Sequence, residues 1–262
     1  MITLLGWGIC RARYNAGDWV GPYLFEKMTG IKPRHVTPAM TKQPYILSCG
    51  SILQNAKSNS IVWGSGLISY AKVPKNITVL AVRGPLTRNA LIKQGIKCPA
   101  VYGDPGLLLP RFYSPQIEKK YKVGIIPHYI EHNLIKSYFA AIPNVLIIDI
   151  NRPIEKVLND IISCKSTIST SLHGIIFSHA YDVPCMWARY PNTKVIGGNF
   201  KFHDYYMSRG MSQFSPRIVT ILPKNSDRLY EEINKYPQPH AVYDCDILLK
   251  VCPFGKSLAQ IK

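Results

Sequence analysis

The segment richest in candidate chemistry runs from Thr167 to Gly174 and reads TISTSLHG. This pattern predicts a strand that ends in hydroxyl residues and passes directly into an apolar helix, Ile175 to Tyr181. The free N–H groups and the positive dipole end of such a helix start can bind an anion. The same dipole disfavours a protonated imidazole. We therefore expect His173 to be protonated, and to act as an acid, only when an anion is bound beside it. A neutral histidine packed at a helix start is the alternative interpretation.

Two further cations are predicted near the carboxyl ends of strands, where α/β sheets place their ligands. Arg83 follows the apolar run 77–82, and its planar guanidinium suits a phosphate or a carboxylate. Lys194 lies in the loop beyond a later strand, and Arg189 stands at the end of that strand. We therefore expect Arg83, His173 and Lys194 to converge on one small, multiply charged anion. A solvated surface lysine is the alternative for Lys194.

Acidic residues are scarce in the first part of the chain, and two of them stand in glycine turns. Residues 1–113 contain three acids, of which Asp18 lies in the turn NAGD and Asp104 in the turn GDPG. Such rare carboxylates are candidates for a site. An ordinary turn former or helix cap is an equally good interpretation of each, and Asp18 would cap a helix that ends at Gly30.

Several common sites are excluded by the order of their residues. His128 and His132 stand four apart, but they lack the HExxH order and a third ligand, so we expect no metal site. The glycine turns at 6–8 and 63–66 fit neither the dinucleotide-binding nor the P-loop pattern, and no GxSxG is present. The seven cysteines form no C-x-x-C pair, so we expect reduced and mostly buried thiols.

Short β-branched runs alternate with amphipathic stretches along the whole chain, which predicts an α/β protein. The strands are expected near residues 2–8, 45–49, 60–64, 77–82, 122–126, 144–149, 166–170, 184–189 and 217–222. A helix from Leu86 to Gln94 is bracketed by Pro85 and Gly95. The strand pattern stops around 110–115 and then restarts. We therefore predict domains at 1–113 and 114–235, and a tail, 236–262, that packs back across the linker.

The charge of the chain points to an anionic partner. It has 32 Lys and Arg against 15 Asp and Glu, a net charge of +17. Nucleic acid, an anionic membrane face and a phosphorylated substrate all fit this charge. The basic residues are scattered without a recognised nucleic-acid-binding motif, which disfavours the first. No apolar run reaches the roughly 18 residues of a membrane span, and the chain starts unlike a secretory signal, so we expect a cytoplasmic protein.

Six short motifs occur in a particular order along most of the chain. They are NAGD at 15–18, WGSG at 63–66, RGPLTR at 83–88, GDPGLLLP at 103–110, IPHY at 126–129 and STSLHG at 169–174. Together they resemble the polysaccharide pyruvyltransferase family, especially its compact xanthan-type branch. The resemblance implies two Rossmann-like domains that face a cleft, as in glycosyltransferase-B-like folds. It also implies transfer of pyruvate from phosphoenolpyruvate to a sugar as a cyclic ketal, with no cofactor.

The resemblance also implies roles for particular residues. Arg83, His173 and Lys194 match basic residues implicated in donor binding or catalysis. Asn15 and Asp18 match residues that line the cleft from the first domain. On this basis His173 would protonate the methylene carbon of phosphoenolpyruvate, after which a sugar hydroxyl attacks, phosphate leaves and a second hydroxyl closes the ketal. Binding the donor would need no metal.

Two positions depart from the family pattern. Many members carry Arg two residues before the motif histidine, where this chain has Ser171, so we expect Arg189 to supply that donor contact. Many also place Glu after the NAGD turn, where this chain has Trp19, which can stack on a sugar face instead. Asp104 and His128, inside shared motifs, complete the predicted substrate-binding residues with Ser171. Asp104 is also the alternative to Asp18 as the base.

Two other classes of function remain open at this point. A glycosyltransferase that uses a sugar nucleotide would share the fold but consume a different donor. A non-enzymatic nucleic-acid binder would need only the charge. For the pyruvyltransferase, we expect a lipid-linked oligosaccharide as the acceptor, and the positive charge would hold the enzyme on the anionic inner face of the cytoplasmic membrane.

Overall fold

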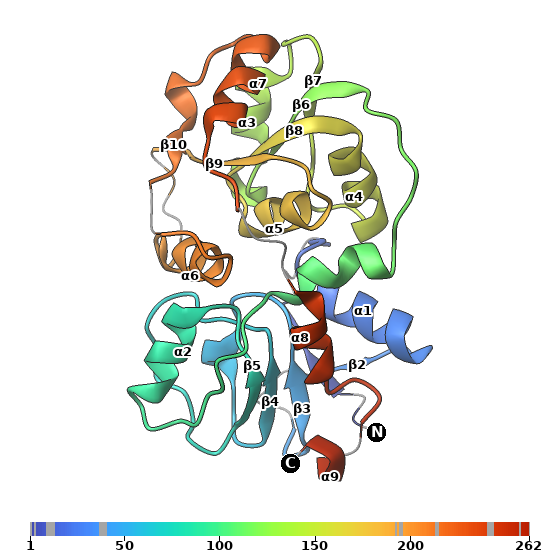
Figure 1. Ribbon diagram of the computed structural model, residues 1–262, viewed down its shortest axis with the longest axis vertical. Coiled ribbons are helices and arrows are strands. Elements are labelled where there is room, and N and C mark those ends of the chain that lie inside the picture. The colour runs from blue at the N-terminus through green and yellow to red at the C-terminus, as the bar shows by residue number, and fades with distance from the viewer. Residues whose placement is uncertain are drawn as a thin grey trace.

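The structure is a computed structural model. It describes residues 2, 4–8, 14–36, 41–191, 193, 196–212, 215–239, 244–256 and 258–261. Two five-stranded sheets dominate it, one above the other in Figure 1. We call the part built on the first sheet the first lobe and the part built on the second sheet the second lobe. All pairings between the described strands are parallel, as the predicted α/β class requires.

The first sheet has the strand order β2-β1-β3-β4-β5. Its strands are β1 (Leu4–Gly6), β2 (Arg34–His35), β3 (Tyr45–Leu47), β4 (Ser60–Trp63) and β5 (Thr78–Ala81). The helices of this lobe are α1 (Val20–Thr29), α2 (Pro85–Ile92) and the 3₁₀ turn η2 (Leu53–Asn55). β1, β3 and β4 are buried along their whole length, which explains their continuous apolar sequences.

The second sheet has the order β10-β9-β8-β6-β7. Its strands are β6 (Tyr121–Ile126), β7 (Val145–Ile147), β8 (Cys164–Ser169), β9 (Cys185–Arg189) and β10 (Arg217–Ile218). Its helices are η4 (Tyr129–Glu131), α3 (His132–Phe139), α4 (Ile154–Ile162), α5 (Leu172–Ala180), α6 (Phe200–Ser208), η5 (Val219–Ile221) and α7 (Ser226–Lys235). α6 leaves the second lobe and packs on α2 of the first (Figure 1).

Three further helical elements complete the described structure. They are η3 (Pro105–Arg111), α8 (Cys245–Lys250) and the terminal α9 (Leu258–Ile261). η3 packs against α5, and α8 lies on the first lobe, where the Trp63 Nε1–H donates to the Leu248 carbonyl at 2.9 Å. The Phe254 ring packs edge-on against Trp63. Residues 240–243 of the predicted tail lie outside the described residues.

The two lobes share a hydrophobic core. One cluster of buried side chains includes Leu5 and Trp63 from the first sheet together with Ile168 and Phe177 from the second lobe. A separate cluster lies within the first lobe, around Tyr45.

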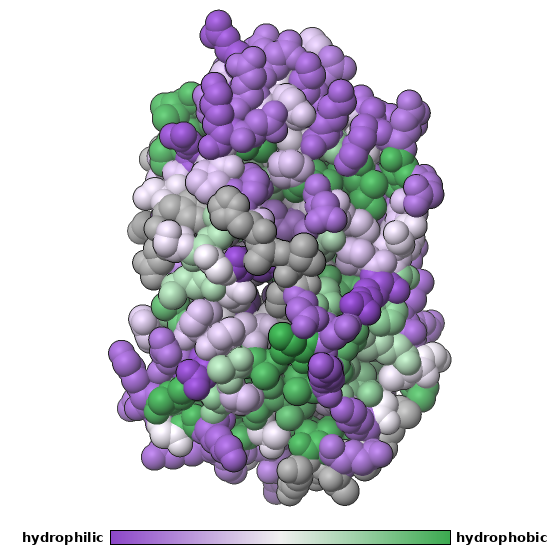
Figure 2. Space-filling view, in the orientation of Figure 1, coloured by the Kyte–Doolittle hydropathy of each residue, from purple (hydrophilic) through white to green (hydrophobic). Residues whose placement is uncertain are grey.

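On the face drawn in Figure 2, hydrophilic residues crowd the second lobe, whereas hydrophobic residues gather on the first lobe. No helix in the described ranges is long and apolar enough to cross a membrane.

The predicted strands are all present, with some differences at their ends. β2 was not predicted, because a two-residue edge strand with exposed Arg34 carries no apolar signal. The strand predicted at 217–222 is wrong beyond Ile218, where the chain turns into η5. The helix end at Gly30 is confirmed by its left-handed φ of 72°. Asp18 does not cap this helix, since Trp19 occupies the N-cap position and no side chain of the described residues caps it.

Candidate functional site

The topology alone selects one region of the molecule for a site. Each sheet winds first to one side and then to the other, so its order reverses between β1 and β3 in one lobe and between β6 and β8 in the other. In doubly wound sheets, ligands bind beyond the carboxyl ends of the strands at this reversal. Cys49 follows β3, His128 follows β6 and His173 follows β8. Both reversal points therefore supply side chains that can do chemistry.

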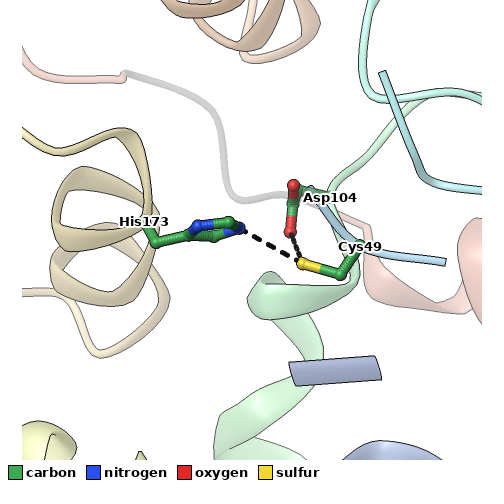
Figure 3. Close-up of side chains that lie close together, drawn as sticks. All are labelled: Cys49, Asp104 and His173. Atoms are coloured by element: carbon green, nitrogen blue, oxygen red, sulfur yellow. Dashed lines mark hydrogen bonds between the residues drawn. The ribbon is translucent and has the colours of Figure 1, made fainter. Parts of the chain in front are cut away.

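Cys49, Asp104 and His173 meet at the junction between the lobes (Figure 3). The Cys49 thiol donates to Asp104 Oδ1 at 3.2 Å, and Cys49 Sγ lies 3.3 Å from His173 Nε2. Asp104 is 0% exposed and caps η3, because Oδ1 also accepts the Gly106 N–H at 2.9 Å. Residues from the β3 end, η3 and α5 thus form one cluster that spans both lobes. Donor atoms from all three lie within 4.8 Å of one another, close enough for one metal ion.

The turn at residues 15–18 lies directly against this cluster. Asn15 Oδ1 accepts the Gly17 N–H at 3.0 Å, which holds the turn closed. A Cβ on Gly17 would lie 2.0 Å from His173 Nδ1, so only glycine allows the turn to approach the ring this closely. Burial raises the pKa of Asp18, the next residue, to about 6. The turn therefore packs on His173 through Gly17, whereas the Asp18 carboxylate lies against Gly8 and acts electrostatically on Cys49.

The electrostatics of the cluster favour the uncharged forms of His173 and Cys49 when no ligand is bound. Burial lowers the pKa of His173, Asp104 opposes this shift, and Lys201 and Arg83 lower it further. Burial also raises the pKa of the Cys49 thiol well above its usual value, and the neighbouring Asp104 and Asp18 carboxylates act in the same direction. The free protein therefore holds a neutral imidazole. A bound anion would raise the pKa of His173, which is the coupling expected from the sequence.

Lys201 and His128 add positive charge and polar surface from the second lobe. Burial lowers the pKa of Lys201, on α6, to about 8; Arg83 lowers it too and Glu131 opposes. Burial and then the Lys201 charge lower the pKa of His128 to about 4. The backbone N–H of His128 donates to Thr170 Oγ1 at 2.8 Å, and the Thr170 hydroxyl in turn donates to the Glu131 carboxylate. His128 Nδ1 is buried without a partner among the described residues.

Arg83 is held inside the contact between the lobes. Its side chain is 0% exposed, and its Nε–H donates to Asp204 Oδ2 of α6 at 3.1 Å. The terminal nitrogens donate to Ser51 Oγ and to the Leu67 carbonyl, each at 2.6 Å. A Cβ on Gly66 would lie 2.4 Å from Arg83 Cζ, so the guanidinium packs directly against the backbone of Gly66. The structure thus shows Arg83 in a buried ion pair, and its contact with a donor stays a prediction.

The remaining predicted residues are placed as follows. Ser171 is the N-cap residue of α5 and its N–H donates to Ser169 Oγ, but no side chain in the described part of the protein caps the helix. Arg189 ends β9 and donates to Asn199 Oδ1 at 3.1 Å. Lys194 lies outside the described residues. The convergence of Arg83, His173 and Lys194 on one anion therefore stays a prediction, with His173 and Arg83 at the same junction.

Three residues of this region were not identified from the sequence. Cys49 had one usable signal, its position just after a predicted strand, but a lone cysteine suggests no chemistry. Lys201 and Asp204 belong to no motif, and only the packing of α6 on α2 brings them to the junction. The expectation of no metal site rests on the spacing of His128 and His132. The sulfur of Cys49, by contrast, lies between Asp104 and His173.

Comparisons with known proteins identify the family. A family model described as polysaccharide pyruvyl transferase matches residues 36–192, more than half of the chain. An uncharacterised protein, L143, of Acanthamoeba polyphaga mimivirus is 32% identical over 231 residues, which cover 84% of this chain and 79% of the viral protein. No solved structure matches. The matched range contains Cys49, Asp104 and His173. The chain belongs to the polysaccharide pyruvyltransferase family, whose members are transferases of pyruvate onto polysaccharide.

Proposed function

We propose that this protein transfers the pyruvyl group of phosphoenolpyruvate to a sugar, where it forms a cyclic ketal. The observation that carries the proposal is the position of His173, between the Asp18 turn of the first lobe and the cationic Lys201 of the second. The turn that carries Asp18 contacts the His173 ring, and the charge of Lys201 acts on the same ring. We further propose that the lobes form a glycosyltransferase-B-like pair, which is supported by their common strand order.

The donor carries a carboxylate and a phosphate on one carbon, so it needs several positive groups. Lys201 supplies an ammonium ion, and the uncapped start of α5 supplies backbone N–H groups and the positive end of its dipole. Arg83 adds positive potential from within the contact between the lobes, although its own hydrogen bonds go to Asp204, Ser51 and Leu67. Lys194, and Arg189 in place of an arginine at Ser171, are the further contacts that the family resemblance implies. No cofactor enters this scheme.

The chemistry follows from the protonation of one carbon. His173, charged while the anion is bound, donates its proton to the methylene carbon and leaves positive character on the central carbon. A sugar hydroxyl attacks that carbon, phosphate departs, and a second hydroxyl of the same sugar closes the ring. Over the whole reaction one carbon–oxygen bond to phosphate breaks and two to the sugar form. The two hydroxyl protons end on the new methyl group and on phosphate.

Asp18 is the proposed base that removes the hydroxyl protons. Its pKa of about 6 leaves it ionised at neutral pH, yet basic enough to accept a proton. Asp104 is less suited, because it is fully buried and already accepts bonds from the Cys49 thiol and the Gly106 N–H. Next to Asp18, Trp19 is 38% exposed and stacks on Tyr14 with ring centroids 5.0 Å apart. This aromatic pair is the proposed surface for the acceptor sugar.

The proposed acceptor is a lipid-linked oligosaccharide at an anionic membrane surface. The net charge of +17 supports this location, since the negative potential of an anionic membrane attracts a basic protein. The test offers phosphoenolpyruvate to the protein with a panel of lipid-linked oligosaccharides and measures phosphate release. Release that depends on one acceptor supports the proposal. Consumption of a sugar nucleotide in place of phosphoenolpyruvate would instead identify a glycosyltransferase.

The shifted pKa values of Asp18 and Lys201 predict two limbs in the pH profile of kcat/KM for phosphoenolpyruvate. The pKa of Lys201 is about 8, so its charge is lost as the pH rises through 8. The pKa of Asp18 is about 6, so its carboxylate is protonated as the pH falls through 6. Because kcat/KM reports the free enzyme, we expect each of these ionisations to lower it, that of Asp18 below pH 6 and that of Lys201 above pH 8.

Replacing Lys201 tests the alkaline limb of this profile. Lys201→Met should remove the fall above pH 8 and raise KM for phosphoenolpyruvate by about tenfold, the loss of one charge-assisted contact. Lys165→Met, which removes an exposed lysine of β8, is the matched control and should leave the profile unchanged. If the alkaline limb persists in Lys201→Met, Lys201 is not the group that binds the donor.

A further inference from the structure

We propose that Cys49, Asp104 and His173 form a binding site for a thiophilic divalent cation of the zinc class. The three side chains come from the end of β3, the start of η3 and the start of α5, and all face one point (Figure 3). One sulfur, one carboxylate oxygen and one imidazole nitrogen are the donor types that Zn²⁺ takes in proteins. The site goes beyond the proposed transfer reaction, because it exists without any substrate.

The distances fit a single ion. With metal–ligand distances of about 2.0–2.3 Å, the ligand atoms of a tetrahedral zinc site lie about 3.3–3.6 Å apart. Cys49 Sγ lies 3.2 Å from Asp104 Oδ1 and 3.3 Å from His173 Nε2, and donor atoms of the three all lie within 4.8 Å. Small side-chain movements therefore suffice to enclose an ion. Three protein ligands would leave a fourth position, which is the arrangement of open zinc sites.

An unused carboxylate oxygen is the second observation. Asp104 Oδ1 is fixed by the Gly106 N–H, whereas the buried Oδ2 has no hydrogen-bond partner among the described residues. A buried carboxylate oxygen without a partner carries a free-energy cost unless a cation or a donor compensates it. The Gly106 bond also orients the carboxylate, and the Gly17 backbone confines the His173 ring. Such supporting contacts are typical of metal ligands.

Charge and ligand softness favour a zinc-like ion over Mg²⁺ or Ca²⁺. A bound cation would deprotonate Cys49, and a thiolate selects zinc-class metals over those that prefer oxygen. Asp18 acts electrostatically on Cys49 from the neighbouring turn, so a second carboxylate adds negative potential. The site would thus balance a divalent ion with the Cys49 thiolate and Asp104, with Asp18 close by.

The same geometry argues against a nucleophilic cysteine. In a Cys-His-Asp arrangement for nucleophilic catalysis, the acid holds the imidazole and the imidazole activates the thiol. Here the carboxylate of Asp104 accepts directly from the Cys49 thiol, which opposes formation of a free thiolate. A bound divalent ion would instead favour the Cys49 thiolate, because its charge stabilises the thiolate and the Asp104 carboxylate together. A bound metal would also occupy His173 Nε2, so metal binding and proton donation by His173 exclude each other.

Cobalt provides a direct test on the full chain without substrate. Protein freed of metal with a chelator is titrated with Co²⁺, and its absorbance is recorded before Zn²⁺ is added in competition. We expect one Co²⁺ per chain with thiolate-to-cobalt charge-transfer and tetrahedral bands, both abolished by Zn²⁺. Asp104→Asn should weaken binding by at least about 100-fold, because the loss of a supporting contact alone can cost this much and Asp104 is a ligand. This variant keeps the acceptor for the Gly106 N–H, so η3 remains capped.

Cysteine variants identify the ligand. Cys49→Ser should lose the charge-transfer band, whereas Cys98→Ser, which alters another buried free thiol, should keep it. Circular dichroism confirms that each variant is folded before the titration. A wild-type spectrum without a thiolate band, or a band that survives in Cys49→Ser, would overturn the proposal. The cobalt titration needs no phosphoenolpyruvate. A negative titration would therefore overturn the metal site and leave the proposed transfer reaction standing, and a negative activity assay would leave the metal site standing.

Discussion

His173→Asn is expected to lower kcat for pyruvyl transfer by about 10³-fold while the variant remains folded, because general acid catalysis typically contributes 10²–10⁴-fold. Asparagine approximates the size of the imidazole but cannot donate a proton to carbon. The measurement is phosphate release from phosphoenolpyruvate with a saturating acceptor, in the presence of a metal chelator. The chelator matters because a cation bound to His173 would mask the effect.

A histidine in the same helix provides the control for this variant. His179 lies on α5 too, but its Nδ1 is 3.0 Å from the Tyr205 hydroxyl, away from the cluster. His179→Asn should therefore change stability and leave kcat of the folded protein nearly unaltered. If His173→Asn keeps the wild-type kcat, or if both variants lose activity equally, His173 is not the proton donor.

Asp204→Asn is expected to reduce the free energy of unfolding by about 3–5 kcal/mol, the usual cost of an unpaired buried charge. The Asp204 carboxylate accepts from Arg83 Nε–H at 3.1 Å and from the Thr87 N–H and hydroxyl at 2.9 and 2.7 Å. Both members of the ion pair are 0% exposed. An amide cannot neutralise the guanidinium, so Arg83 keeps its buried charge without compensation. Urea denaturation at neutral pH measures the change.

An exposed ion pair gives the matched comparison. Arg111 Nη2 lies 2.7 Å from Asp246 Oδ1, and the two side chains are 50% and 57% exposed. Asp246→Asn should therefore cost less than about 1 kcal/mol, as for most surface pairs. An equally small loss in Asp204→Asn would contradict the view that Arg83 and Asp204 fasten the two lobes together.

The fold was largely predictable, because its signals are local. Runs such as Ser60–Trp63 alternate with amphipathic stretches, and Pro85 and Gly30 mark a helix start and a helix end. Where local signals compete, prediction failed. Asp18 is a good N-cap residue by type, but the tight turn closed by Asn15 carries its side chain toward the junction and leaves Trp19 at the helix start.

The site was less predictable, because it is assembled from distant segments. His173 and Asp104 stand in motifs that the sequence displays. Lys201 and Asp204 come from a helix whose sequence shows no such motif, and their role depends on α6 packing against α2. The pairing of Asp204 with Arg83 changes the environment of Arg83 completely. Only a tertiary contact of this kind pairs a cation that was expected to bind a ligand with a carboxylate of the protein itself.

The central claim is that carbon 2 of phosphoenolpyruvate ends in a ketal on a sugar. Phosphoenolpyruvate labelled with ¹³C at this carbon, incubated with the protein and an active acceptor, tests it directly by NMR. The account predicts a new quaternary ketal signal in the saccharide, with one phosphate released for each ketal, and its loss in His173→Asn. Label that remains in phosphoenolpyruvate or appears only in free pyruvate would contradict the account.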